Sequence, residues 1–294
     1  MLSSIIQFLN KLSNSFKEEE NKPWYSLYGN NIAPSIDYPN SNMYELIEVA
    51  CKKYPINIAY NYMGKKCVYF KFKNQINNVA KGLKKIGIKK HDKITICMPN
   101  TPEAIITFYA INQIGAISNM IHPLSGEKEI EFYISKSESK YVLTIDLLCD
   151  KVLEASKNTK IKKIIVAKVQ NSLPFFIKIL YNLTKKHPKI EYDEKVIKWS
   201  KFYKEAKKYK KEYQENSKTN DDAVILYSGG TSGEPKGVVL SNMNFNALGM
   251  QSFKMADPAK PGDSILSIMP IFHGFGLGVS IHTALISGMT CILV

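Results

Sequence analysis

A segment rich in glycine and hydroxyl side chains, residues 227–237, has the composition of a phosphate-binding loop. It reads Tyr-Ser-Gly-Gly-Thr-Ser-Gly-Glu-Pro-Lys-Gly. Glycine lets backbone N–H groups approach an anion closely, hydroxyls donate further hydrogen bonds, and Lys236 supplies a positive charge. The segment is not a Walker A loop, in which Ser or Thr follows the lysine, because Gly237 follows Lys236 here. A polyphosphate-binding loop is therefore one hypothesis, and a plain surface loop is the other.

A second candidate for chemistry is His273, which lies in the run Met-Pro-Ile-Phe-His-Gly-Phe-Gly at residues 269–276. A lone histidine in an apolar run is more often a buried, hydrogen-bonded side chain than a catalytic one. The other interpretation is that His273, with Gly274 beside it, lines a substrate site. The residues alone leave both interpretations open.

The elements that must position these residues alternate between helix and strand. Helical patterns cover 74–87, 102–115, 127–138 and 147–157, and strand patterns cover 93–98, 141–145, 161–169 and 223–227. This alternation predicts the α/β class, with mostly parallel sheets and flanking helices. The loop at 227–237 then follows a strand and precedes a helix that is capped by Ser241 or Asn242.

Composition excludes several other classes of protein. The 294 residues are 45% hydrophobic and 22% charged, which excludes disordered, collagen-like and disulfide-scaffold chains. The formal net charge is +14, but every basic residue is Lys, and nucleic-acid readout relies on the bidentate contacts of Arg. We therefore expect no nucleic-acid partner. The five cysteines are widely spaced and include no CxxC pair, which favours a reducing, cytoplasmic compartment and no structural zinc.

Two long uncharged stretches, 104–126 and 264–294, exceed the length that a membrane span requires. Turn residues interrupt both of them, and buried elements of an α/β protein have the same composition, so we expect no transmembrane helix. Residues 2–16 place apolar side chains on one helical face. We expect this segment to be a helix packed on the domain, or a frayed end, rather than a membrane anchor.

The positive charge is concentrated in residues 151–220, where 19 lysines stand against seven acidic residues, a net charge of +12. Within this stretch, residues 170–212 combine a run of aromatic and aliphatic side chains with dense Lys. Two interpretations stay open. One is a peripheral contact with a membrane surface, and the other is a solvated excursion whose aromatic side chains pack on the domain.

The loop at 227–237 resembles the phosphate-binding signature of the adenylate-forming (AMP-binding) superfamily, Ser/Thr-Ser-Gly-Ser/Thr-Thr/Ser-Gly-x-Pro-Lys-Gly. It departs from that signature at Gly229, where the family more often has Ser. Residues 67–83 and 86–124 resemble the family's early segments, and 269–276 resembles its second core signature, Leu-Pro-Leu-Phe-His. Residues 22–48 and the run at 173–183 are most similar to bacterial long-chain fatty-acid–CoA ligases.

The resemblance implies activation of a long-chain fatty acid by ATP and Mg²⁺ to an acyl-adenylate, followed by transfer of the acyl group to coenzyme A. The residues implied to bind the ATP phosphates are Ser228, Gly229, Gly230, Thr231, Ser232, Gly233 and Lys236. His273 and Gly274 are implied to line the acyl site, and Thr231 to reach Mg²⁺ through the phosphates. The alternatives are an adenylation domain that loads a carrier protein and a non-catalytic lipid- or nucleotide-binding module.

The resemblance also implies how the chain is organised. It predicts an N-terminal arm at 1–40, a first α/β subdomain at 41–169, a Lys-rich linker at 170–220 and the start of a second subdomain at 221–294. The family's later segments, including a C-terminal lid domain with the catalytic lysine, have no counterpart in these residues. We therefore expect an N-terminal fragment of the adenylate-forming fold that is inactive alone and carries no catalytic residue of its own.

Overall fold

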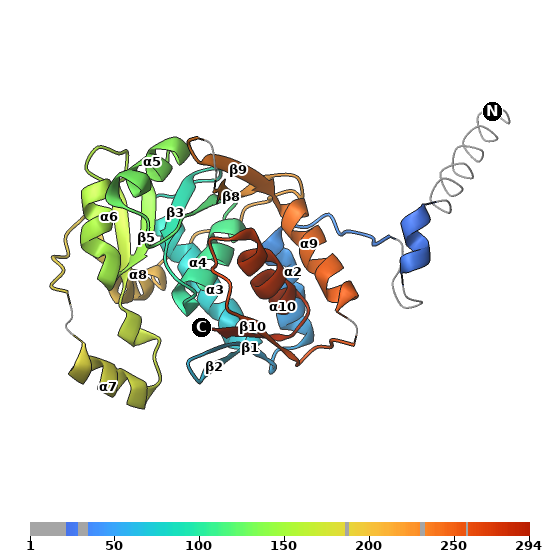
Figure 1. Cartoon of the computed structure of the whole chain (residues 1–294). Coiled ribbons are helices and arrows are strands. Elements are labelled where there is room, and N and C mark those ends of the chain that lie inside the picture. The colour runs from blue at the N-terminus through green and yellow to red at the C-terminus, as the bar shows by residue number, and fades with distance from the viewer. Residues whose placement is uncertain (1–21, 29–34, 186–187, 230–232, 257) are drawn as a thin grey trace.

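The computed structural model describes residues 22–28, 35–185, 188–229, 233–256 and 258–294. The larger of its two sheets has seven strands in the order β7–β6–β5–β3–β4–β8–β9 (Figure 1). Neighbouring strands are parallel except in the β8–β9 hairpin, so the predicted mostly parallel sheet is confirmed. The strands are β7 (Val196–Lys198), β6 (Lys163–Ala167), β5 (Tyr141–Ile145), β3 (Lys93–Cys97), β4 (Ile117–Met120), β8 (Asp222–Ser228) and β9 (Lys236–Ser241).

The second sheet has four strands in the order β10–β11–β1–β2. They are β10 (Ser264–Ser267), β11 (Thr290–Leu293), β1 (Ile58–Tyr62) and β2 (Lys65–Val68). Strands β10, β11 and β1 are parallel, and β2 returns antiparallel to β1. Each sheet therefore takes strands from both of the ranges 41–169 and 221–294.

Helices surround the two sheets and also lie between them (Figure 1). They are α2 (Met43–Lys53), α3 (Tyr69–Lys85), α4 (Pro102–Gln113), α5 (Glu127–Ser137), α6 (Cys149–Ala155), α7 (Phe175–Thr184), α8 (Trp199–Ala206), α9 (Asn242–Met255) and α10 (Thr283–Ile286). Short turns of 3₁₀-helix occur at η1 (Pro23–Leu27), η2 (Asp146–Leu148) and η3 (Val169–Asn171), and η4 (Phe275–His282) is a π-helix.

Helix α4 explains the first long uncharged stretch of the sequence. Every residue of this 12-residue helix is buried, so its composition reflects contact with protein on all sides rather than with lipid. Among the residues that the structure describes, no helix is long and apolar enough to cross a membrane. The N-terminal residues 2–16, for which a packed or frayed helix is expected, lie outside the described residues.

Local sequence signals set the ends of the helices that flank the site. The Thr101 side chain accepts a hydrogen bond from the Ala104 N–H, and Pro102 occupies the first helical position of α4. Ser241 caps α9 by accepting from the Asn244 N–H, and the Asn244 side chain binds back to the Ser241 backbone. This capping box confirms the predicted start of the helix after the Gly-rich loop.

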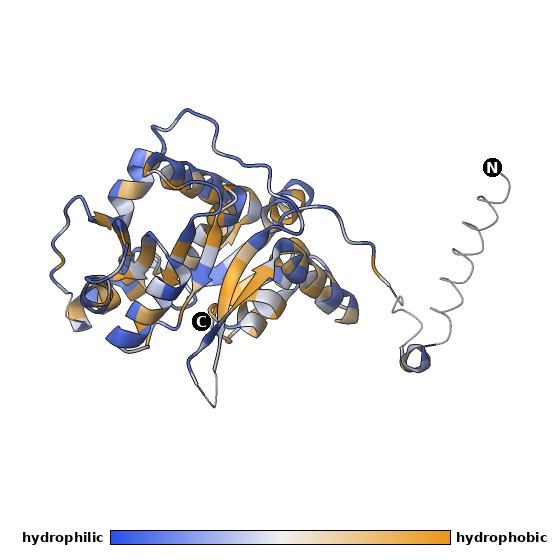
Figure 2. Ribbon diagram, turned by 90° about the horizontal axis from the view of Figure 1, so that it is seen from above, coloured by the Kyte–Doolittle hydropathy of each residue, from blue (hydrophilic) through white to orange (hydrophobic). Residues whose placement is uncertain are grey.

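Hydrophobic residues concentrate in the central strands (Figure 2). One large cluster of buried residues joins both sheets. The two halves of the Lys-rich range 170–220 differ in their contact with this core. Its second half packs onto the domain, because the Phe202 ring fills the space that Gly82 leaves open on α3. Helix α7, in its first half, contains no buried residue.

Candidate functional site

A cavity of about 490 Å³ lies where β4 and β8 end. These two strands are parallel neighbours, with Ser118 opposite Val224, so their carboxyl ends meet at one edge of the sheet. Ligands of open α/β sheets bind at this edge. Four segments line the cavity: the last residue of β4 with the residues up to 125 that follow it, two side chains of α5, the β8–β9 hairpin and residues 272–273.

The β8–β9 hairpin brings the Gly-rich loop to this cavity. Ser228 is paired with Lys236 across the hairpin, and the Ser228 hydroxyl lies 3.5 Å from the Lys236 carbonyl oxygen. Ser228, Gly229 and Pro235 line the cavity. Lys236 and Gly233 are exposed beside it and are not part of the lining. The loop therefore presents a hydroxyl, a glycine and an exposed ammonium group at one edge of the sheet.

Part of the predicted phosphate loop cannot be placed. Gly230, Thr231 and Ser232 lie outside the described residues, and with them the predicted contact between Thr231 and Mg²⁺. Within the described residues, no group of three or more His, Cys, Asp or Glu side chains could hold a metal ion. Glu129 is the carboxylate among the described residues that line the cavity. This donor set does not fit a protein-built Mg²⁺ site.

His273 reaches the same cavity from a different part of the chain. Its N–H donates to the Pro270 carbonyl oxygen at 3.0 Å, and its Nδ1 accepts from the Phe275 N–H at 3.2 Å. The second bond leaves Nε2 as the ring nitrogen that can bind a ligand. The side chain is exposed. Gly274 follows it but does not line the cavity, and its nearest contact for an added Cβ is Leu226 at 3.5 Å.

The turn that carries His273 is held by Asn100, which lies just after β3. Asn100 is buried, and its side-chain amide donates to the carbonyl oxygens of Ser267 and Met269 at 2.9 and 3.0 Å. Its Oδ1 accepts from the Ile271 N–H at 2.7 Å. These three bonds fix residues 267–271 against the carboxyl edge of the larger sheet and thereby position His273.

A different histidine has the buried, hydrogen-bonded character that was the alternative for His273. His282 is fully buried, and its ring nitrogens lie 3.1 Å from the Tyr109 hydroxyl and 3.1 Å from the Asn246 side-chain oxygen. Burial lowers the pKa of His282 to about 3. His282 therefore has a structural role, and His273 is the histidine that faces the cavity from this region.

The lining includes side chains that the sequence did not single out, among them His122, Phe272, Tyr133 and Glu129. The rings of His122 and Phe272 are 4.3 Å apart. The Tyr133 ring packs at a tilt on the Tyr227 ring, with the ring centroids 4.2 Å apart, and its hydroxyl donates to Glu129 Oε1 at 2.8 Å. Hydrogen bonds from the side chains of Ser125 and Tyr133 lower the pKa of Glu129, so this carboxylate is ionised at the edge of the cavity.

One signal could have found His122. The dipeptide His122-Pro123 follows the end of β4 after one intervening residue, and β4 is the parallel neighbour of β8. Residues that follow adjacent parallel strands share one edge of the sheet. The strand order, which periodicity does not provide, was the missing information.

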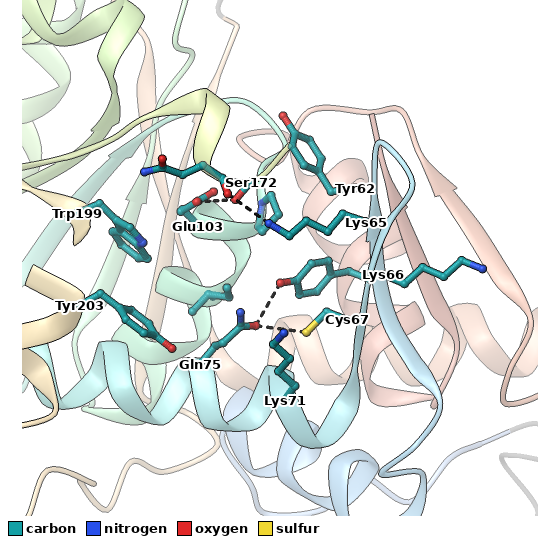
Figure 3. A pocket seen from close by; sticks show the side chains of 14 residues that line it. Tyr62, Lys65, Lys66, Cys67, Lys71, Gln75, Glu103, Ser172, Trp199 and Tyr203 are labelled. Carbon is teal, nitrogen blue, oxygen red and sulfur yellow. Dashed lines mark hydrogen bonds between the residues drawn. The ribbon is translucent and has the colours of Figure 1, made fainter. Parts of the chain in front are cut away.

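A second cavity, of about 240 Å³, lies away from this site, between β2, the start of α4 and residues 171–172 (Figure 3). None of the residues predicted from sequence lines it. Its floor includes Glu103, which accepts a hydrogen bond from the Ser172 hydroxyl at 2.6 Å. Burial raises the pKa of Glu103.

Known proteins that are similar to this chain were found by family, by sequence and by structure. The family model described as "AMP-binding enzyme" matches residues 47–294. A long-chain-fatty-acid–CoA ligase of Bacillus subtilis is 29% identical over 280 residues, which cover 94% of this chain and 50% of the relative. A 4-coumarate–CoA ligase of Arabidopsis thaliana is 28% identical over 218 residues, which cover 73% of this chain and 35% of the relative.

Among solved structures, a long-chain-fatty-acid–CoA ligase from Archaeoglobus fulgidus matches with a TM-score of 0.70. The match covers 88% of this chain and 48% of that protein, at 21% sequence identity, so it shows a shared fold. The chain thus spans about half the length of the relatives that it matches over most of its own length.

Proposed function

This chain belongs to the AMP-binding enzyme family, and we propose that it forms the ATP- and acyl-binding part of an ATP-dependent carboxylate–CoA ligase. One observation carries the proposal. The cavity at the ends of β4 and β8 is lined both by Ser228 and Gly229 of the Gly-rich hairpin and by His273. The proposed phosphate-binding loop and a group that could contact a carboxylate thus line one cavity, as adenylate formation would require.

In the proposed reaction, a carboxylate oxygen of the acid attacks the α-phosphorus of ATP, and the bond to pyrophosphate breaks. The hairpin binds the phosphates through backbone N–H groups and hydroxyls, and the Lys236 ammonium offsets the charge that grows on the departing pyrophosphate. Gly230, Thr231 and Ser232 belong to this proposed loop. Mg²⁺, where bound, would screen the phosphate charge, and its ligands would be mainly the nucleotide's own oxygens.

His273 is proposed to orient the acid on the other side of the α-phosphorus. Its Nε2 is the nitrogen that can bind a ligand, because Nδ1 accepts from the Phe275 N–H. Gly274 is proposed to leave room for the acid beside it. The apolar ring of Phe272 and the face of the His122 imidazole beside it would contact the acyl group.

The acid is proposed to be a long-chain fatty acid, with coenzyme A as the acceptor. The Bacillus subtilis ligase, which aligns over 94% of this chain, supports this choice. An aromatic acid is the second candidate, because the Arabidopsis thaliana 4-coumarate–CoA ligase aligns over 73% of the chain. We further propose the segments 1–40, 41–169, 170–220 and 221–294 as the organisation of the chain. A cytoplasmic location is supported by its five free, buried cysteines.

Nucleotide affinity tests the proposed loop. Isothermal titration of ATP into the wild-type chain and into Lys236→Ala should show at least tenfold weaker binding in the variant, since a charge-assisted contact is lost. Lys162→Ala, which removes an exposed lysine away from the cavity, should bind ATP like the wild type. Equal ATP affinity of Lys236→Ala and the wild type would contradict the proposal that this loop binds ATP.

Equilibrium dialysis tests the substrate class. Labelled palmitate and labelled 4-coumarate are each measured with and without ATP, for the wild type and for His273→Ala. Retention of palmitate that His273→Ala reduces supports the fatty-acid proposal, and retention of 4-coumarate instead supports the aromatic acid. Binding of either acid that is indifferent to His273→Ala contradicts the role given to His273.

A further inference from the structure

Helix α7 carries its apolar side chains on the outside of the molecule. None of its ten residues is buried. The exposed fractions of Phe176 and Leu183 are 82% and 79%, values typical of polar surface residues. The remaining exposed apolar side chains of the helix are Phe175, Ile177, Ile179 and Leu180. Exposed apolar side chains gathered in this way mark an interaction surface.

Five of the six exposed apolar side chains share one face, and that face points away from the domain. Successive helical residues are rotated by about 100°, so residues 175, 176, 179, 180 and 183 fall within an arc of about 140° opposite Tyr181. Tyr181 is the residue of α7 that packs against the core. Helix α7 therefore turns its widest apolar face to solvent, and Tyr181 on the opposite side contacts the protein.

The residues just before α7 are held by hydrogen bonds and burial, and these contacts fix the orientation of the helix. Just before the helix, the Ser172 hydroxyl donates to the buried carboxylate of Glu103 at 2.6 Å, and Lys65 Nζ donates to the Asn171 carbonyl oxygen at 3.2 Å (Figure 3). Leu173 is buried in the core. Beyond this anchor, α7 stands apart from both sheets (Figure 1).

The positive charge around α7 indicates the kind of partner that its exposed face would bind. Residues 155–190 contain nine lysines and neither Asp nor Glu. In the part of the chain that the structure describes, Lys168, Lys178 and Lys185 form no ion pair. Unpaired lysines beside an exposed apolar face fit a surface that is both anionic and apolar underneath.

We propose that α7 docks on a lipid bilayer that contains anionic lipids. The outward face of Phe175, Phe176, Ile179, Leu180 and Leu183 enters the boundary between headgroups and acyl chains, and the neighbouring lysines contact lipid phosphates. The face lies on a helix that does not line the ATP cavity, so the proposal stands independently of the ligase assignment. It goes beyond that assignment by giving the protein a defined orientation on a membrane.

Vesicle sedimentation tests the proposal with the full chain. The wild type should bind vesicles of phosphatidylcholine with about a third phosphatidylglycerol, bind pure phosphatidylcholine at least tenfold more weakly, and be released by high salt. The double variant Phe176→Ser/Leu183→Ser should partition at least tenfold more weakly into the anionic vesicles. Its fold is expected to be intact because both side chains are exposed.

Ile56→Ser is the matched control. It removes an apolar side chain that is 83% exposed but lies far from α7 in the sequence, and it should bind like the wild type. Absence of wild-type binding to anionic vesicles, or equal binding by the double variant, overturns the proposal. So does sedimentation velocity without lipid that shows a wild-type dimer and a monomeric double variant, because α7 would then contact a second copy of the chain.

Discussion

The clearest prediction about this fold concerns the protonation of His282. The side chain is fully buried and is bonded at both nitrogens, to the Tyr109 hydroxyl and to Asn246 Oδ1. Asn246 uses its side-chain N–H to bind the Ser41 carbonyl oxygen at 2.9 Å, so its Oδ1 must accept from His282 Nε2. The Tyr109 hydroxyl then donates to Nδ1. The ring is satisfied in its neutral form, and burial lowers its pKa from 6.5 to about 3.

This pKa difference makes stability depend on pH. In the unfolded chain His282 binds a proton near pH 6.5, whereas in the folded chain it does so only near pH 3. Above this window both states are neutral, and His282 contributes no pH dependence. As pH falls through the window, the unfolded state gains protons that the folded state does not, so stability decreases. Between pH 7.5 and pH 5.0 the loss from this side chain is about 2 kcal/mol.

Urea unfolding of the wild type and of His282→Gln at these two pH values measures the effect. The variant is less stable at both, by about 1–3 kcal/mol, because the buried Tyr109 hydroxyl loses its acceptor. It has no titrating group at this position, however. The difference in unfolding free energy between the two pH values should therefore be about 2 kcal/mol smaller in the variant than in the wild type.

His273→Gln serves as the control, because it removes an exposed imidazole from the same region. It should keep the pH dependence of the wild type. The reasoning is refuted if His282→Gln retains the full wild-type difference between pH 7.5 and pH 5.0. In that case another group would cause the acid sensitivity.

Further predictions concern close packing, capping and burial. Gly276→Ala should destabilise the fold by about 1–3 kcal/mol, because its Cβ would clash with the Pro270 carbonyl oxygen. Thermal unfolding should show no such loss for Gly274→Ala, and equal melting temperatures of Gly276→Ala and the wild type would contradict the packing argument. Ser241→Ala should cost about 1 kcal/mol by removing the cap of α9, and Ser241→Asp should restore most of that loss in the same melt. All five cysteines are buried, and burial raises the pKa of the Cys97 thiol to about 12. A thiol reagent should therefore label the native chain slowly and the unfolded chain at all five cysteines. Rapid labelling of the native chain would contradict the burial of these side chains.

Most of the fold could be predicted because local patterns specify it. The alternation of helix and strand located β5 at 141–145 and β3 within 93–98, since buried strands and capped helices leave clear periodicities. Boundaries were less accurate. Helix α3 covers 69–85 rather than 74–87, because Tyr69 and Phe72 continue its buried face toward the N-terminus. Strand order could not be read at all, because the contacts that set it join residues distant in sequence.

The same limit applies to the site. The hairpin of residues 228–236 was visible because its glycines, hydroxyls and lysine are consecutive in the sequence. His122 and Glu129 were missed because their place in the cavity depends on β4 lying beside β8. The roles predicted for Lys236 and His273 stay predictions, and the binding experiments above decide them.

Asn100 shows why such a site needs the whole fold rather than its motifs. His273 lies in a recognisable run of residues, but the run alone does not bring it to the Gly-rich hairpin. Three hydrogen bonds from the buried Asn100 side chain hold residues 267–271, which are 167–171 positions further along the chain. A buried amide that satisfies two carbonyl oxygens and one N–H of the same turn fixes both its position and its direction. The turn therefore approaches the end of β8 because Asn100 follows β3 at the same sheet edge, and the cavity forms where two distant motifs are held against that edge.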